Sequence, residues 1–155
     1  AALTRRYKMI DLSWSRLRPW RKLLAGQFTG EAFRPFVHHI ERIEVTGKLG
    51  PRTLLSGWLA SRLRLDRDVL HLYDGRHVAI NLYCRNGDQT AEFTVERVPG
   101  ERLVRASAEV HGGPSHNELV SLPNDALPQS LSYALRRQER DRVYEQAIKI
   151  IGNWN

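Results

Sequence analysis

Apolar residues recur at helical spacing near the start of the chain, with one interruption. The pattern begins after Asp11 or Ser13, either of which is a good N-cap, and continues as far as Phe28. Pro19 lies inside it, and an interior proline removes a backbone hydrogen bond. We therefore expect a helix that either bends at Pro19 or starts again there, with Pro19 in its first turn.

The next segments predict a loop, a strand and a second helix. Residues 30–35 are loop-like, and residues 39–46 alternate with charged side chains at exposed positions, as in a strand. Turn residues follow at 47–51. The helix expected at about 52–64 carries a broad apolar face that includes Trp58.

The middle of the chain alternates between apolar and polar residues, which predicts a run of antiparallel hairpins. The alternating segments are residues 77–85, 91–97 and 102–110, with a short edge strand at 118–122. Turn residues at 86–88 and at 99–100 separate them. The alternation directs Cys84 to the apolar side of its strand, where a thiol is usually an inert small hydrophobe.

Two helical patterns close the chain, at residues 128–138 and 141–151, the second capped by Asp141 and stopped near Gly152. The whole pattern predicts an α+β domain. We expect an antiparallel sheet of about four to five strands, with N-terminal, middle and two C-terminal helices packed on it. A length of 155 residues favours a single domain over residues 1–155.

Composition and charge narrow the class of protein. Hydrophobic residues make up 41% and charged residues 26%, which is typical of a globular domain. Twenty-four Lys and Arg against 17 Asp and Glu give a net charge of +7, which would attract acidic partners. No apolar run approaches the ~18 residues of a membrane span and no signal peptide opens the chain, so we expect a cytoplasmic protein. Cys84 is the only cysteine, which excludes an intrachain disulfide.

Residues capable of catalysis or metal binding do not form a recognisable constellation, and we expect no catalytic residue, cofactor or metal. His111 and His116 flank a loop but lack further ligands for a metal shell, and surface histidines are the better interpretation. His38 and His39 would point to opposite faces of a strand. The segment 47–53 leads into a helix N-terminus. Two interpretations stay open for it: a weak anion site, or a plain connection between strand and helix.

Aromatic residues give little support to a nucleic-acid interface. Trp14, Trp20 and Trp58 lie on predicted helices at core-like spacing, and Tyr83 is the candidate exposed aromatic on a strand. Single-strand binders interleave aromatic and basic residues along a sheet face. An aromatic core with solvated arginines is therefore favoured.

One segment combines tryptophan and arginine at unusual density. We select Trp14, Arg16, Trp20 and Arg21 as candidate partner-binding residues, because tryptophan and arginine are enriched in interface hot spots. The competing interpretation buries both indole rings and pairs the arginines with nearby carboxylates in internal salt bridges. Both interpretations stay open at this point.

Three segments resemble the OpcA family of glucose-6-phosphate dehydrogenase assembly proteins. Residues 11–23 resemble its Asp-Leu-x-Trp-x-Arg-Leu-x-Pro-Trp-Arg-x-Leu motif, and residues 54–63 its Leu-Leu-x-Gly-Trp-Leu-Ala-x-Arg-Leu stretch. Residues 135–147 are similar to the ending Leu-Arg-Arg…Asp-x-Val-Tyr-x-Glu-Ala. The matches occur in order over nearly the whole chain and correspond to the C-terminal half of that family, which agrees with a chain that lacks an initiator methionine.

This resemblance implies a non-catalytic accessory protein. Its partners would be glucose-6-phosphate dehydrogenase, which it would assemble or allosterically activate in the oxidative pentose phosphate pathway, and its own N-terminal domain in the full-length protein. A dithiol switch cannot lie wholly within a chain that has one cysteine. Two rival hypotheses remain: a basic nucleic-acid-binding module, whose affinity would fall steeply with salt, and a small sugar-phosphate-binding domain, which its ligand would stabilise.

Overall fold

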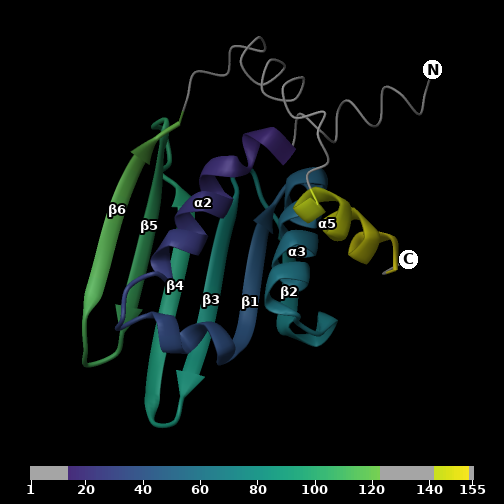
Figure 1. Ribbon diagram of the computed structural model, residues 1–155. Helices are drawn as coiled ribbons and strands as arrows, with labels where there is room; N and C mark the ends of the chain where they lie inside the picture. The colour runs from purple at the N-terminus through teal and green to yellow at the C-terminus, as the bar shows by residue number, and fades with distance from the viewer. Residues whose placement is uncertain (1–13, 123–141, 154–155) are drawn as a thin grey trace, which may run out of the picture.

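A computed structural model describes residues 14–122 and 142–153, which form a six-stranded sheet with helices on one face (Figure 1). The strand order is β2-β1-β3-β4-β5-β6. The strands are β1 (Ile40–Gly47), β2 (Leu70–Asp74), β3 (Ala79–Asn86), β4 (Gln89–Arg97), β5 (Leu103–Val110) and β6 (Ser115–Ser121). The α+β class is confirmed.

The sheet is mixed and has six strands, whereas the sequence pattern predicted an antiparallel sheet of about four to five strands. β2 pairs in parallel with β1, and every other neighbouring pair is antiparallel. A parallel pair needs a crossover connection, which the second helix supplies between β1 and β2. The segment of β2 was not predicted as a strand, because its five residues are too few for a clear alternating signal.

The principal helices are α2 (Arg18–Gln27), α3 (Leu49–Leu63) and α5 (Arg142–Gly152), with short 3-10 helices η1 (Arg34–His38) and η2 (Arg67–Val69). α2 packs on β4 and β5, and α3 packs on β1 and β2. α5 packs mainly on α3, so this C-terminal helix adds to the helix layer rather than covering the sheet directly. The helix expected at 128–138 lies outside the described residues, as does Asp141, the expected cap of the helix at 141–151.

The N-terminal helix starts again near Pro19. A helical turn at residues 14–16 ends at Leu17, and α2 then begins with Pro19 in its first turn, as one of the two expected alternatives required. Proline is tolerated there because its missing N–H is unpaired in any helix. The expected loop at 30–35 ends earlier than predicted, because η1 begins at Arg34.

The core lies between the sheet and the helices. The buried faces of the four central strands contribute Ile43, Val45, Ile80, Leu82, Cys84, Ala91, Phe93, Val95, Val104, Ala106, Ala108 and Val110. Phe93 sits at its centre, with the Phe28 ring stacked at 4.3 Å and the Phe33 ring edge-on at 6.0 Å between centroids. Trp58 is buried on α3, as its position on the apolar helix face predicted.

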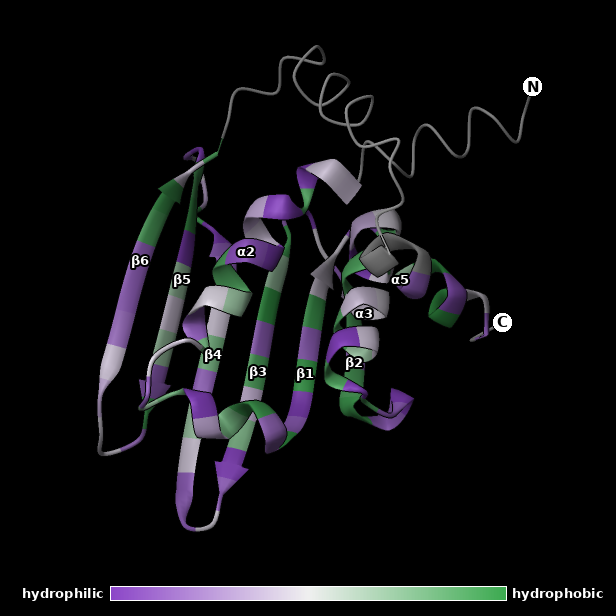
Figure 2. Cartoon of the chain, viewed as in Figure 1, coloured by the Kyte–Doolittle hydropathy of each residue, from purple (hydrophilic) through white to green (hydrophobic). Residues whose placement is uncertain are grey.

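The opposite face of the sheet is polar. Figure 2 shows hydrophobic and hydrophilic residues alternating along the strands, which is the expected pattern for a sheet with one covered and one open face. No described helix packs against this open face (Figure 1). Within residues 14–122 and 142–153, no helix combines the length and the apolar composition that a membrane span requires.

Candidate partner-binding site

The candidate residues Trp14 and Trp20 lie in the core. Their exposed fractions are 5% and 7%, and they belong to the same buried cluster as Leu17 and Leu24. Helical spacing places these side chains on the side of the chain that faces the sheet. Two of the four candidate residues are therefore held beneath the surface.

Arg21 makes its described contacts with Trp14. Its Cζ lies 3.7 Å from the centre of the Trp14 ring, and its Nη2 donates a hydrogen bond of 3.1 Å to the Trp14 carbonyl oxygen. A guanidinium over an indole is a cation–π contact of about 0.5–2 kcal/mol. Arg21 thus fastens the turn at Trp14 to α2 through an aromatic ring and a backbone carbonyl oxygen.

Arg16 differs from Arg21 in being exposed. Within residues 14–122 and 142–153 it forms no hydrogen bond or ion pair. Arg18 and Lys22 are also exposed, and their spacing of four residues places them on the same side of α2. The sequence from Trp14 to Gly30 holds no acidic residue. We call Arg16, in the turn that precedes α2, together with Arg18 and Lys22 on α2, the α2 basic cluster.

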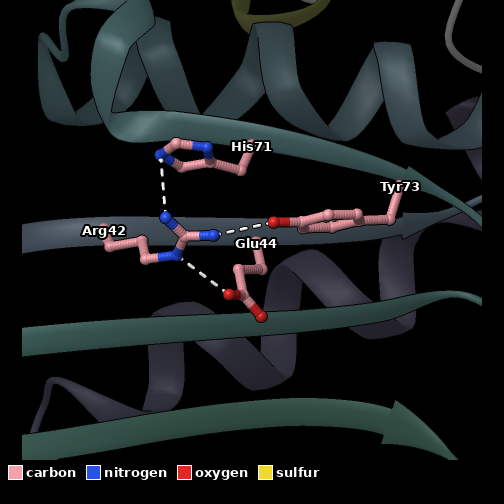
Figure 3. Close-up of polar contacts among 4 residues, drawn as sticks. All are labelled: Arg42, Glu44, His71 and Tyr73. Atoms are coloured by element: carbon pink, nitrogen blue, oxygen red, sulfur yellow. Dashed lines mark hydrogen bonds and ion pairs between the residues drawn. The ribbon is translucent and has the colours of Figure 1, made fainter.

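On the open face of the sheet, Arg42 joins three side chains from β1 and β2 (Figure 3). Its Nε donates to Glu44 at 2.9 Å, its Nη1 to His71 at 3.3 Å and its Nη2 to Tyr73 at 2.7 Å. Because a guanidinium only donates, Nε2 of His71 is the acceptor. The hydrogen bond with Glu44 raises the pKa of Arg42. The cluster ties the parallel edge strand β2 to β1.

This cluster was not predicted from the sequence. Arg42 and Glu44 are two apart on one strand, so they share a face, but His71 lies 29 residues from Arg42. Only the parallel pairing of β1 with β2 brings them together. The alternation of charged residues along β1 was the one available signal.

The remainder of the open face carries three glutamates on β4 and β5 together with Arg85 and Arg105. Glu92 on β4 is directly opposite Glu109 on β5, and neither forms an ion pair within the described part of the chain. Tyr83 on β3 lies opposite Glu92 on β4. Burial raises the pKa of Tyr83, and the nearby carboxylates of Glu44 and Glu92 raise it further. An aromatic residue among carboxylates is poorly placed to stack on a nucleic acid, whose phosphates these charges would repel.

Cys84 and the histidines show no arrangement for catalysis or metal binding in the described ranges. Cys84 is 3% exposed, and burial raises its pKa to about 12, with a further contribution from Glu41. A buried thiol of high pKa is a poor nucleophile. His111 contacts the hydroxyl of Thr90, and no three His, Cys, Asp or Glu side chains among the described residues converge as metal ligands.

The segment leading into α3 uses its nearest arginine internally. Arg52 donates from Nη1 to the Gly47 carbonyl oxygen at 3.0 Å and to Asp74 at 3.1 Å. This ion pair attaches the end of β2 to the first turns of α3. The guanidinium is thus already engaged at the point where the sequence left a weak anion site open.

In this α+β domain the arginines at the sheet, such as Arg42 and Arg52, pair with other side chains of the same domain. A family model described as the C-terminal domain of the glucose-6-phosphate dehydrogenase subunit matches residues 7–148. The chain belongs to this family, which links it to glucose-6-phosphate dehydrogenase and confirms the resemblance to OpcA-type proteins. No curated protein and no solved structure matches the chain.

Proposed function

We propose that this chain is a non-catalytic accessory domain that binds glucose-6-phosphate dehydrogenase and assembles or allosterically activates it, in the oxidative pentose phosphate pathway. The observation that carries the proposal is the family match, which extends over residues 7–148 and names a domain of a subunit of that enzyme. The open face supports the non-catalytic part of the proposal, because Arg42 donates its hydrogen bonds to neighbouring side chains of the sheet.

The α2 basic cluster is the contact surface that we propose for the dehydrogenase. Arg16 and Lys22 are exposed on a segment without acidic residues, and an exposed guanidinium can form a bidentate pair with a carboxylate. Trp14, Trp20 and Arg21, the other members of the candidate set, would act from beneath by holding this segment in place. The partner surface would therefore be acidic.

Two further parts of the proposal concern the setting of the chain. The family description names a C-terminal domain, so we propose an N-terminal domain of the same protein as a second partner. We also propose a cytoplasmic location, where an unpaired thiol such as Cys84 stays reduced.

The experiment that tests the function is association with the dehydrogenase from the same organism. The chain and the enzyme are mixed and separated by size, and the dehydrogenase activity of the mixture is compared with that of the enzyme alone. We expect co-elution and a change in activity. Separate elution with unchanged activity, together with binding to duplex DNA that weakens steeply with salt, would instead support the nucleic-acid hypothesis.

A further inference from the structure

The outer edge of β6 is unpaired within the described part of the chain. β6 is the last strand of the sheet, and Figure 1 shows no labelled element on its free side. Its seven residues are exposed except for Val120, which is half-buried. Leu119 is an exposed apolar side chain on this edge, at 58%.

The backbone register shows which groups face outward. Leu122 donates to the Arg102 carbonyl, and Val110 donates to the Pro114 carbonyl. Hydrogen-bonded and non-hydrogen-bonded pairs alternate along an antiparallel ladder, so the even-numbered residues of β6 bond to β5. The N–H and C=O groups of the odd-numbered residues therefore point away from the sheet: Ser115, Asn117, Leu119 and Ser121.

This edge lacks most of the devices that usually block strand pairing. Edge strands are commonly protected by lysine, proline, a bulge or an inward-pointing charge. β6 contains no lysine, arginine or proline, and its register with β5 runs without a shift. The single charged side chain is that of Glu118, on the helix-bearing face of the sheet opposite Ala106.

We propose that β6 pairs antiparallel with β6 of a second copy of this chain, in a register centred on Asn117. This register places Glu118 opposite His116 of the copy, and His116 opposite Glu118 of the copy. These are non-hydrogen-bonded positions of the new ladder, where opposing side chains approach most closely. Each carboxylate then meets an imidazole that can donate to it.

Charge complementarity selects this register over its neighbour. A register centred on Glu118 would set the two Glu118 carboxylates directly against each other, and like charges at opposed positions are destabilising. Centring on Asn117 replaces that repulsion by two acid–imidazole pairs. The inference does not rest on the proposed function, because it uses only the edge strand and its charges.

The first test is the oligomeric state of the chain by sedimentation velocity, from about 10 μM to about 1 mM, since one strand pair buries a small interface. We expect a dimer whose fraction rises with concentration. Asn117→Pro removes an outward N–H and should abolish the dimer with little change in Tm, because proline is tolerated at outward-facing edge positions. The control Val120→Pro removes an N–H that points to β5 and should lower Tm.

A charge swap tests the register. His116→Glu opposes two glutamates across the axis and should weaken the dimer by about three- to thirty-fold. The double variant His116→Glu, Glu118→His restores opposite partners and should recover the dimer. A chain that stays monomeric, a dimer indifferent to Asn117→Pro, or a double variant as weak as the single one would overturn the proposal. An Asn117→Pro variant that instead loses only the dehydrogenase would assign the edge to a strand of another protein.

Discussion

The tryptophan–arginine segment shows how residues of one motif divide between packing and surface. Trp14 and Trp20 are core residues, Arg21 is stacked on Trp14, and Arg16 is exposed. The sequence could identify the segment as unusual, because its composition is visible without a structure. It could not separate Arg16 from Arg21, because the break before α2 shifts the helical stripe by an amount that spacing alone does not give.

We expect Arg21→Ala to destabilise the fold and Arg16→Ala to leave it intact. Loss of the cation–π contact and the hydrogen bond to the Trp14 carbonyl should cost about 1–2 kcal/mol, or roughly 3–8 °C in Tm. Replacement of the exposed Arg16 should change Tm by less than about 2 °C. Thermal melts of the two variants against the parent check this, and equal Tm values for the two variants would contradict it.

Cys84 should resist modification in the folded state. Its pKa of about 12 keeps the thiol protonated near neutral pH, and its side chain is buried. Alkylation with iodoacetamide at pH 8 should be far slower in native buffer than in denaturant, where the pKa returns to about 8.5. Rapid labelling in native buffer would contradict the burial of Cys84 on the core face of β3.

The raised pKa of Cys84 also predicts a pH dependence of stability. Between about pH 9 and pH 12 the unfolded thiol loses its proton while the folded thiol keeps it, so stability falls as pH rises. The parent should therefore lose Tm faster than Cys84→Ala between pH 9 and pH 11. Parallel slopes for the two proteins would contradict the linkage.

At the scale of elements, the structure differs from the sequence-based expectation mainly at β2. The hairpins from β3 to β5 were predictable because apolar and polar residues alternate over eight or nine residues in each. β2 is short, and its place in the sheet depends on Arg42 on one side and on the pair of Arg52 with Asp74 at its end. Such contacts, between residues far apart in sequence, leave no periodic signal.

We expect Arg42→Gln to loosen β2 selectively. The variant loses the hydrogen bonds to His71 and Tyr73 that cross from β1 to the edge strand. Amide hydrogen exchange in residues 70–74 should become faster, while exchange in β4 and β5 stays unchanged. As a control, Arg85→Gln removes only an exposed pair with Glu41 and should leave β2 unaffected.

The contact between α3 and α5 depends on a glycine. A Cβ on Gly57 would lie 2.8 Å from the Ala147 carbonyl oxygen and from the Ile151 side chain. Gly57→Ala should therefore lower Tm, although alanine raises intrinsic helix stability by about 1 kcal/mol. Gly26→Ala on α2 is the matched control, because its Cβ would meet nothing within 4 Å, and it should keep or raise Tm. A stabilised Gly57→Ala variant would show that the two helices are not in close contact.

At the scale of the whole molecule, charge is distributed unevenly over the two sides of the sheet. The open face carries charges of both signs, with Glu44, Glu92, Glu96 and Glu109 beside Arg42, Arg85 and Arg105, whereas the segment with the α2 basic cluster carries positive charge without an acidic residue. The net charge of +7 could be counted from the sequence, but not the pairing of charges on the open face, such as Arg105 with Glu96, because it depends on which strands are neighbours. The family could be identified from three short motifs, and the family model that matches residues 7–148 confirms it.

The α2 basic cluster requires an acidic contact surface on the dehydrogenase. If the α2 basic cluster meets an acidic patch, association should weaken as salt rises, since exposed charges are screened over about 8–10 Å at ordinary ionic strength. Charges elsewhere on the molecule should contribute little. Arg62 is a suitable comparison because it is an exposed arginine on α3, outside the cluster.

The most direct test of the proposed contact is the affinity of the purified dehydrogenase for the parent chain, Arg16→Ala with Lys22→Ala, and Arg62→Ala, measured by titration at about 0.1 M salt. We predict that the double variant binds roughly ten- to a hundred-fold more weakly, a loss of about 1–3 kcal/mol, with an unchanged Tm. Arg62→Ala should bind like the parent. Undiminished affinity of a folded double variant would contradict the assignment of the contact to α2, and absence of binding by the parent chain would contradict the proposed function itself.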